Sequence, residues 1–559
     1  MLRSHPMEIR APIRPSKKPY IVEIAAAKNG QRIPVVNGKS LHSRYDPESE
    51  ASRWAAESMA RKPNARVVFV LGMGFAHHIR AIRAARPAGE MTIVVFEPIA
   101  EIVTAYAREV GQNIDQVSLW PTPIPQDVVD AVAEVLTPTL VNQTLILAHP
   151  PSLAVDPPAY ERILSSIQST VDQIAMSLTT GWGFGFEWIE HSLENVSRLP
   201  EVSFLNQLAA FFQPNPPAAL VLGAGPSLNG EWDRIGQAQV LKLAVDTVLE
   251  PMEHAGVRAH LAFLLDSQEG IVRLVDRIDA SEVNLVTALD VHPAIFRRPW
   301  RNVILTTCDR GVSSWLERRL PCSIGSLKQG GSVATCAFDL ARQARCAPIY
   351  LGGIDFSFTR FDTYCRGTAY ERRAQESQNR FASIEQQLFI MKSQRSERLV
   401  GGKATQENLY NYCQWMKDEI GRTDQPVILL KSSGLLAETV SSDGLDRIGS
   451  ERFPAGFSES AFETRLPANG RLSRETIENA MKELRCELES FLNPDHFRDA
   501  DRLEQALKES DITDVIESVV EPAIAVSRYE REKSTGAGAQ LLPNLRDRLA
   551  DLVQRIKPG

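Results

Sequence analysis

The chain has 559 residues, of which 43% are hydrophobic and 23% charged, and its formal net charge is −7. This composition excludes a chain that is disordered throughout, the length suggests about three domains, and the acidic balance argues against nucleic acid as a partner. No apolar run approaches the ~18 residues of a membrane span, and no apolar signal core follows the basic N-terminus. We therefore expect a cytoplasmic protein without a membrane span.

Residues 1–215 form the first predicted segment, and they follow the order of a nucleotide-binding βαβ unit. Short β-like runs come first, and Asp46 then has the form of a helix start. A buried strand run, the turn Gly72-x-Gly74, an amphipathic helix and a second buried run ending at Glu97 follow. This order predicts a Rossmann-like α/β domain. Either the turn and Glu97 bind a nucleotide or S-adenosylmethionine, or the fold is a platform for an acceptor protein and has no cofactor.

Residues 216–455 repeat the alternation of strands and helices more strongly. Their short apolar runs predict a doubly wound, mostly parallel sheet with helices on both faces. The runs read AALVL, KLAVD, LAFLLD, NLVTALD, NVILTTCD, PIYLGGIDF and PVILL. The polar stretch 357–404 is expected to be irregular.

Residues 456–559 contain almost no β-like runs. Apolar residues recur there at helical spacing, in the stretches 474–492, 499–510, 513–532 and 541–556. We expect a C-terminal all-α helical domain that acts as a cap or an oligomerisation bundle.

Metal ligands are not predicted anywhere in the chain. The seven cysteines include no CxxC pair, which indicates reduced packing thiols rather than a disulfide frame or a zinc site. His77 and His78 lack a third ligand at metal spacing, so we interpret them as helix-face residues.

Two glycine turns in the central segment can accept an anion. Both precede a predicted helix, whose first N–H groups lack partners within the helix. Alternatively, each turn is a tight connection that packs closely without a ligand. Their residues are Gly223, Gly225, Pro226 and Ser227 in the first turn, with Ser227 as a candidate helix cap, and Gly330, Gly331 and Ser332 in the second.

Acidic residues follow most of the central strands. In an open α/β sheet, ligands bind outside the carboxyl ends of the strands, and an Asp there can contact a ribose or a base or can hold a metal. The alternative is that each Asp caps the turn in which it lies. The residues are Asp246, Asp266, Asp290, Asp309 and Asp355.

The motifs of the central segment resemble those of the motility-associated-factor (Maf) glycosyltransferases, bacterial enzymes that modify flagellin. The resemblance lies in GAGPSLNGEWDRI, in AVDTVLEPMEHAGVRAHLAFLLDSQEG and in the long stretch that starts with GGSVATCAFDLARQ and contains GGIDFSFTRFDTYCRGT. It extends to LHSRYDPESEASRW near the N-terminus and covers about residues 40–450. The central domain is similar in turn to bacterial sialyltransferases that use CMP-sialic acid, which share the GxGPSL turn and the Gly-Ile-Asp-Phe strand end.

The resemblance implies transfer of a nonulosonic acid, such as pseudaminic, legionaminic or sialic acid, from CMP to Ser or Thr hydroxyls of flagellin. The CMP-sugar is then a co-substrate, no cofactor stays bound and Mg²⁺ is not predicted. The residues implied in donor binding are Gly223, Gly225, Pro226, Ser227, Asp246, Asp266, Ser267, Gly330, Gly331, Ser332 and Arg366. Asp355 anchors the floor of the site, and Tyr364 and Tyr370 steady the leaving phosphate, within a polar stretch that also holds Arg360.

The general base differs from that of the resembled sialyltransferases, which use a histidine after the Gly-Ile-Asp strand. No histidine occurs here between His292 and His496. Tyr364 stands where Maf-like sequences often have a histidine. Asp362 or Glu407 therefore takes the acceptor proton, or proton removal is weakly assisted. Alternatively, the polar stretch is a loop that merely covers the site.

Two other functions remain open. The first is a pterin diphosphokinase, because archaeal enzymes of that class resemble the central domain and use Mg²⁺ and ATP at positions such as Asp246 and Asp266. Against it stand Ala259-His260, where those enzymes have Pro-Asp, and the lack of a GxxxxGK motif. The second is a flagellin-binding factor without catalysis, which keeps the glycine turns as structure.

Overall fold

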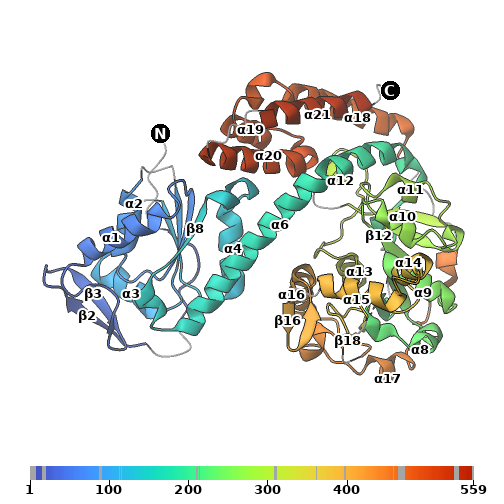
Figure 1. Ribbon diagram of the computed structural model, residues 1–559, viewed down its shortest axis with the longest axis horizontal. Helices are drawn as coiled ribbons and strands as arrows, with labels where there is room; N and C mark the ends of the chain where they lie inside the picture. Colours follow the sequence, from blue (N-terminus) through green and yellow to red (C-terminus); the bar gives the residue numbers. More distant parts are fainter. Residues whose placement is uncertain are drawn as a thin grey trace. The chain divides into compact units, whose positions relative to one another are not determined.

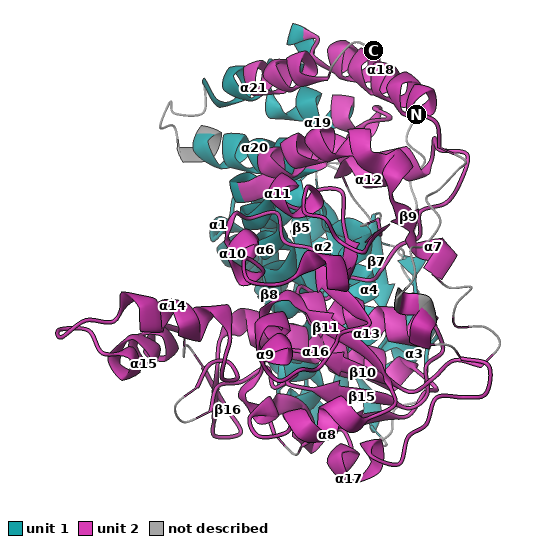
Figure 2. Cartoon of the chain, turned by 90° about the vertical axis from the view of Figure 1, so that its right-hand side faces the viewer, with its two compact units in different colours: residues 1–183, 494–505, 518–545 teal, residues 184–493, 506–517, 546–559 magenta. Residues whose placement is uncertain are grey.

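The structure is a computed structural model (Figure 1), and it divides into two compact units, coloured separately in Figure 2. The first unit comprises residues 1–183, 494–505 and 518–545, and the second 184–493, 506–517 and 546–559. The described residues are 8–14, 20–86, 91–111, 114, 116–208, 212, 215–307, 311–359, 362–395, 398–431, 433–457, 459–463, 472–533 and 540–556. Asp309 and Arg360 lie outside them. The domain boundaries predicted from the sequence stay predictions.

A five-stranded parallel sheet forms the centre of the first unit. Its strands are β1 (Glu8–Ile9), β5 (Val67–Leu71), β6 (Thr92–Phe96), β7 (Val117–Trp120) and β8 (Thr144–Ala148), in the spatial order β1-β7-β6-β5-β8. The chain moves outward from β5 through β6 and β7, and β8 then returns to the other side of β5. The strand order therefore reverses between β5 and β8, which is where sheets of this kind bind ligands.

Helices cover both faces of this sheet, as a Rossmann-like domain requires (Figure 1). Alternate residues of β5 point to opposite faces. Val68 and Val70 pack with α1 (Pro47–Ala60), α2 (His77–Ala84) and α3 (Ala100–Glu109), whereas Val67 and Phe69 pack with α4 (Pro125–Val135) and α6 (Pro157–Asn195). Asp46 caps α1 by accepting the Ser49 N–H (3.0 Å), as predicted. The unit also contains α5 (Pro150–Leu153) and an antiparallel sheet of β2 (Val22–Ala26), β3 (Arg32–Val36) and β4 (Lys39–Ser40).

An eight-stranded, fully parallel sheet forms the centre of the second unit and confirms the predicted doubly wound architecture. Its order is β18-β15-β10-β11-β12-β13-β14-β9. The strands are β9 (Ser203–Phe204), β10 (Ala219–Leu222), β11 (Leu241–Val245), β12 (Leu261–Leu264), β13 (Asn284–Thr287), β14 (Asn302–Leu305), β15 (Ile349–Gly352) and β18 (Val427–Leu429). The order reverses between β10 and β15, so the loops that follow these two strands meet at the switch point.

Short helices join the strands of the second unit, and α13 packs on β10, β11 and β12. The helices are α7 (Leu205–Leu208), α8 (Trp232–Gln237), α9 (Leu249–His254), α10 (Gly270–Leu274), α11 (Pro293–Phe296), α12 (Gly311–Glu317), α13 (Val333–Gln343), α14 (Ala369–Ser377), α15 (Ile384–Arg395), α16 (Glu407–Arg422) and α17 (Gly444–Ile448).

The stretch 357–404 is more regular than predicted. It contains α14, α15 and the hairpin of β16 (Arg398–Val400) and β17 (Lys403–Thr405). The prediction was wrong because α15 has no buried residue, so its sequence shows no apolar periodicity. Figure 2 shows α14 and α15 standing out from the rest of their unit.

The C-terminal part is helical, as predicted. It contains α18 (Arg474–Phe491), α19 (Ala500–Lys508), α20 (Thr513–Lys533) and α21 (Leu541–Arg555). Segments of these helices belong to both compact units. Within the described part of the chain, no helix combines the length and apolar character that crossing a membrane requires.

Candidate functional site

The loops after β10 and β15 meet at the switch point of the larger sheet, where they bring together several predicted site residues. The Gly225 N–H donates to the Gly353 carbonyl (2.8 Å). A Cβ on Gly223 would lie 2.5 Å from that same carbonyl oxygen, and one on Gly225 would collide with the Asp355 carboxylate. The glycines are therefore needed because the two loops touch.

Asp355 fastens the glycine turn to the sheet. Its carboxylate is 6% exposed and accepts the Ser227 N–H (2.9 Å) and the Ser433 hydroxyl (3.1 Å). Burial raises the pKa of Asp355, although the bonds from Ser227 and Ser433 and the charge of Lys431 oppose the rise. The structure thus places Asp355 against the glycine turn, while its role as the floor of a donor site stays a prediction.

The turn itself differs from the predicted start of an α-helix. Pro226 opens a short 3₁₀ helix (Pro226–Leu228), and α8 begins only at Trp232. Ser227 caps no helix, since it lies inside this 3₁₀ helix and both its N–H and its side chain bond to Asp355. The difference follows from the buried carboxylate, which needs donors. The Ser227 N–H is therefore not available to an anion.

Three carboxylates follow β11, β12 and β13 in succession. Burial, opposed by bonds from Thr247, raises the pKa of Asp246 to about 6, and burial raises that of Asp290 to about 6. The charge of Asp266 contributes to both shifts. Asp266 itself accepts the Gln268 N–H (3.0 Å) and so caps its own turn, and the buried Ser267 hydroxyl accepts the Trp188 indole N–H (2.9 Å). The predicted gathering of acids at the strand ends is confirmed for these residues.

The segment 362–371 lines a hollow of about 280 Å³, part of which is open solvent. The rings of Tyr364 and Tyr370 stack there, with centroids 4.8 Å apart, and Arg395 donates to the Tyr364 hydroxyl (2.9 Å). Burial, aided by Tyr364 and by the charge of Asp246, raises the pKa of Tyr370 to about 12. Tyr370 therefore keeps its proton at neutral pH and can act as a donor.

Backbone hydrogen bonds tie this segment to the glycine turn and to the residues just after it. The Cys365 N–H donates to the Ala224 carbonyl (2.8 Å), and the Arg366 N–H donates to the Asn229 side chain (2.9 Å). The Arg366 guanidinium pairs with Asp362 (3.1 Å) and Glu371 (2.8 Å) while staying more than half exposed. Asp362, Tyr364 and Arg366 line the hollow together.

The second glycine turn packs against α16. A Cβ on Gly330 would collide with the Trp415 ring, and one on Gly331, whose φ is +89°, would collide with the Tyr412 ring. Ser332 precedes α13 with an extended backbone and without a side-chain cap. Close packing explains these glycines, while their role in donor binding stays a prediction.

Glu407 lies apart from the hollow. It opens α16 and accepts two hydrogen bonds from Arg398 (2.9 and 3.0 Å), and it is not among the residues that line the hollow. Of the two predicted bases, only Asp362 lies there.

Sequence reasoning missed the ion pair that holds α14. Arg372 donates to Glu250 (2.7 Å) and to Asp276 (2.7 Å), and both Arg372 and Glu250 are nearly buried. Glu250 is buried among Leu249, Pro251 and Met252 in the short helix α9, and no signal in the sequence alone indicates its partner. His254, at the end of the same helix, precedes the Gly-Ile-Asp strand in the sequence and was not among the predicted bases. Its Nδ1 lies near Gly367, 3.6 Å from the position that a Cβ would take.

The glycine turn of the first unit has no free backbone N–H for a phosphate. The Met73 N–H donates to Glu97 (2.9 Å), the Phe75 N–H donates to His42 Nε2 (2.9 Å), and the Gly72 and Ala76 N–H groups donate to backbone carbonyls. The Gly74 N–H also bonds to Glu97. These contacts support the interpretation of a nucleotide fold without a nucleotide.

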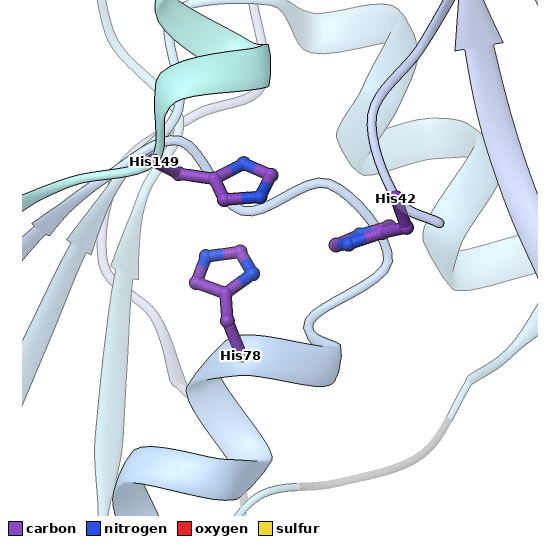
Figure 3. A group of neighbouring side chains, drawn as sticks. All are labelled: His42, His78 and His149. Atoms are coloured by element: carbon purple, nitrogen blue, oxygen red, sulfur yellow. The ribbon is translucent and has the colours of Figure 1, made fainter. Parts of the chain in front are cut away.

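Three histidines meet at the same turn, which corrects the prediction that His78 lacks further ligands at metal spacing (Figure 3). His42, His78 and His149 are buried, and one candidate ligand nitrogen from each lies within 4.8 Å of the others. Burial lowers the pKa of His78 to about 4 and lowers those of His42 and His149 well below the usual value, so the rings are neutral at pH 7. The prediction failed because the three residues are far apart in the sequence.

The second unit is a doubly wound α/β fold whose strand order reverses between β10 and β15, and comparisons with known proteins agree with this fold. Residues 190–361 match the model of the family described as 6-hydroxymethylpterin diphosphokinase MptE-like. The structure of the MAf glycosyltransferase from Magnetospirillum magneticum AMB-1 superposes with a TM-score of 0.55, covering 95% of this chain and 90% of that one at 13% identity. The chain thus shares the fold of that enzyme along nearly its whole length.

An uncharacterized protein of Treponema pallidum (strain Nichols) is 31% identical over 147 residues, which is 24% of this chain. The chain spans only 37% of the length of this curated relative.

Proposed function

We propose that this chain is a Maf-type glycosyltransferase, which transfers a nonulosonic acid of the pseudaminic, legionaminic or sialic type from its CMP donor to Ser or Thr hydroxyls of flagellin in the cytoplasm. The observation that carries the proposal is the junction at the switch point. There the glycine turn after β10, Asp355 and the segment 362–371 are joined by direct hydrogen bonds. The shared fold with the MAf glycosyltransferase supports the same conclusion.

The donors around the hollow suit a departing CMP phosphate, on which negative charge builds. The Tyr364 hydroxyl accepts from Arg395, so its own proton is free to be donated. Tyr370, which stays protonated, lies against it. Arg366 presents an exposed guanidinium at the rim of the hollow, where it pairs with Asp362 and Glu371. As the glycosidic bond breaks, the sugar carbon becomes oxocarbenium-like, and these groups stabilise the leaving group.

Asp362 is the base that we assign to the acceptor hydroxyl. Its carboxylate lines the hollow and pairs with Arg366, whereas Glu407 is held by Arg398 away from it. The base has to reach the proton that it removes, which favours Asp362.

A protein acceptor fits the surface next to the hollow. α15 contributes Leu388 and Met391 to the lining of the hollow, and its neighbours Phe389 and Ile390 are exposed to 68% and 42%. Phe381 and Leu399 are exposed to 78% and 75%. A contiguous patch of such exposed apolar residues would be typical of a protein-binding surface.

A second candidate function is a pterin diphosphokinase. The match to the MptE-like family model favours it. In this case Asp246 and Asp266 hold the Mg²⁺ ion, which binds the ATP phosphates.

Nucleotide-dependent stabilisation separates the candidates. A thermal-shift panel with CMP, CDP, ATP and S-adenosylmethionine, each with and without Mg²⁺, detects a ligand that adds ~2.7 kcal/mol at 100 times its Kd. We expect stabilisation by CMP without Mg²⁺. Stabilisation by ATP with Mg²⁺ alone would replace the glycosyltransferase with the kinase, and no shift with any nucleotide would favour a flagellin-binding factor. Mass measurement of flagellin after incubation with each CMP-nonulosonate then identifies the donor.

A further inference from the structure

The three histidines of the first unit lie where an open α/β sheet binds its ligands. His149 directly follows β8, and His78 lies on α2, just after the glycine turn that follows β5. β5 and β8 are the two neighbouring strands between which the strand order reverses. His42 comes from the segment after β4 and rests on Gly74, where a Cβ would collide with its ring. The backbone N–H groups of the turn at this switch point already donate to other groups of the chain. The three imidazoles therefore lie where other α/β proteins bind a nucleotide.

In two of the rings one nitrogen is held by a hydrogen bond, and the other nitrogen remains as a candidate ligand. His78 Nε2 bonds to the Gly72 carbonyl (2.9 Å), so it carries the proton and the Nδ1 lone pair stays free. His78 is 1% exposed, and its Nδ1 is buried without any hydrogen-bond partner. His149 Nδ1 bonds to the Ser152 hydroxyl (2.8 Å), which leaves Nε2 to face the cluster. A ring held by its second nitrogen is the usual arrangement of a metal-binding histidine.

The rings are arranged so that their nitrogens converge. His78 and His149 stack with centroids 4.1 Å apart and planes 8° from parallel, and each turns one nitrogen towards His42 (Figure 3). The His42 centroid lies 5.7 Å from that of His78 and 5.2 Å from that of His149. A buried acceptor without a partner destabilises the folded state, and a cation between the rings would remove this cost.

We propose that His42, His78 and His149 bind one divalent transition-metal ion of the zinc class. Neutral imidazoles suit such an ion, and three protein ligands leave one coordination position open to water or to an anion. Around zinc, with Zn–N distances of about 2.0–2.1 Å, the nitrogens stand roughly 3.4 Å apart. Binding therefore draws the rings together by about an ångström, and His42 Nε2 exchanges the Phe75 N–H for the ion.

Metal titration of the tag-free, full-length protein tests this proposal. After removal of metals with EDTA, Zn²⁺ is titrated against a chromogenic chelator, and Co²⁺ is used to obtain a visible spectrum. We expect one equivalent of either ion per chain and an absorption typical of Co²⁺ in a nitrogen-ligated site of low coordination number. Failure of the wild-type protein to bind either ion at this stoichiometry would overturn the proposal.

Variants locate the ion. His78→Ala and His149→Gln should each weaken Zn²⁺ binding at least about tenfold, because loss of a ligand costs no less than loss of its supporting bonds. His77→Ala is the matched control, since His77 is the neighbour of His78 on α2, points one nitrogen at the Arg32 carbonyl (3.3 Å) and lies outside the group of three. Circular dichroism checks that each variant is folded. If His78→Ala does not fold, His149→Gln still tests the proposal. The assignment is contradicted if His78→Ala and His149→Gln both bind Zn²⁺ as tightly as the wild type does. It is also contradicted if His77→Ala weakens Zn²⁺ binding as much as they do.

Discussion

Buried carboxylates organise the two switch points at the level of single residues. Glu97 accepts the Met73 N–H in the first unit, and Asp355 accepts the Ser227 N–H in the second. Burial, opposed by hydrogen bonds from Met73 and Tyr160, raises the pKa of Glu97 to about 7. In both turns an acid of the chain takes a place that an anionic ligand takes in other α/β proteins.

Asp246→Asn should stabilise the protein at high pH. The folded-state pKa of Asp246 is about 6 against 3.8 for the model group, so the folded state holds the proton more tightly. The stability from this carboxyl is complete below pH ~4 and is lost as the pH rises through about 6. Asn keeps an oxygen for the Thr247 bonds and carries no charge. By urea unfolding, the variant should gain up to about 3 kcal/mol over the wild type at pH 8 and little at pH 4.

The control for this prediction is Asp279→Asn. Asp279 is an exposed acid, and its bonds from Ser281 lower its pKa, so this variant should gain no stability at pH 8. An Asp246→Asn variant whose advantage is the same at pH 4 and pH 8 would contradict the linkage argument. If Asp246 also contacts the donor, the stabilised variant should bind CMP more weakly.

The base assignment gives a second prediction. Asp362→Asn should lower kcat of sugar transfer by roughly 10²–10⁴, the usual contribution of a general base, with an unchanged melting temperature. Glu407→Gln should leave kcat nearly unchanged, because Glu407 does not line the hollow. Steady-state rates of CMP release measure both. Loss of activity in Glu407→Gln alone would reverse the assignment.

The sequence predicted single residues well where local order was enough. The acids at 246, 266 and 355 follow strands as expected, because a parallel sheet gathers its carboxyl ends at one edge. Their partners were not predictable, since Ser227 and Asp355 are 128 positions apart. The same holds for His78 and His149, which the reversal of strand order between β5 and β8 brings together.

At the level of elements, the contact between α16 and the turn before α13 depends on glycine. Gly331→Ala places a Cβ against the Tyr412 ring in a backbone with φ of +89°. We expect a loss of about 1–2 kcal/mol from the left-handed backbone and about 1–3 kcal/mol more from the clash, measured by chemical unfolding. Gly402→Ala is the control, because its φ is +77° but nothing lies within 4 Å. Equal losses in the two variants would mean that Tyr412 moves aside without cost.

The attachment of α14 gives a fourth prediction. Arg372→Ala leaves the buried Glu250 without its cation, so we expect a loss of about 3–5 kcal/mol in the free energy of unfolding. Arg373→Ala, next to it on the exposed side of the helix, should change stability by less than about 0.5 kcal/mol. A small effect of Arg372→Ala would show that Glu250 gains access to water or a proton.

Elements were predictable from the sequence where burial was strong. The runs around β10, β11 and β15 are entirely buried, and their apolar residues and following acids marked them as strands. α15 buries nothing, so its helix left no pattern to recognise. The spacing of apolar residues in a sequence indicates which residues are buried, so a helix that buries no residue cannot be predicted from it.

At the level of the whole molecule, the alternation of strands and helices predicted both parallel sheets and the helical C-terminal part. It did not predict that residues 494–505 and 518–545 join the first unit. Thr139 donates to Glu504 (2.6 Å), and Gly181 has no room for a Cβ beside the Ser518 carbonyl. Contacts between such distant segments follow from packing, which no local pattern records.

This discontinuity sets an order of events during synthesis. The first unit contains residues 1–183 but needs residues up to 545, which the ribosome makes 362 residues later. At ~5–20 residues per second, roughly 20–70 s separate these points. During that interval the nascent first sheet exists without its last helices, and the surface that they will cover is open to chaperones and to other nascent chains.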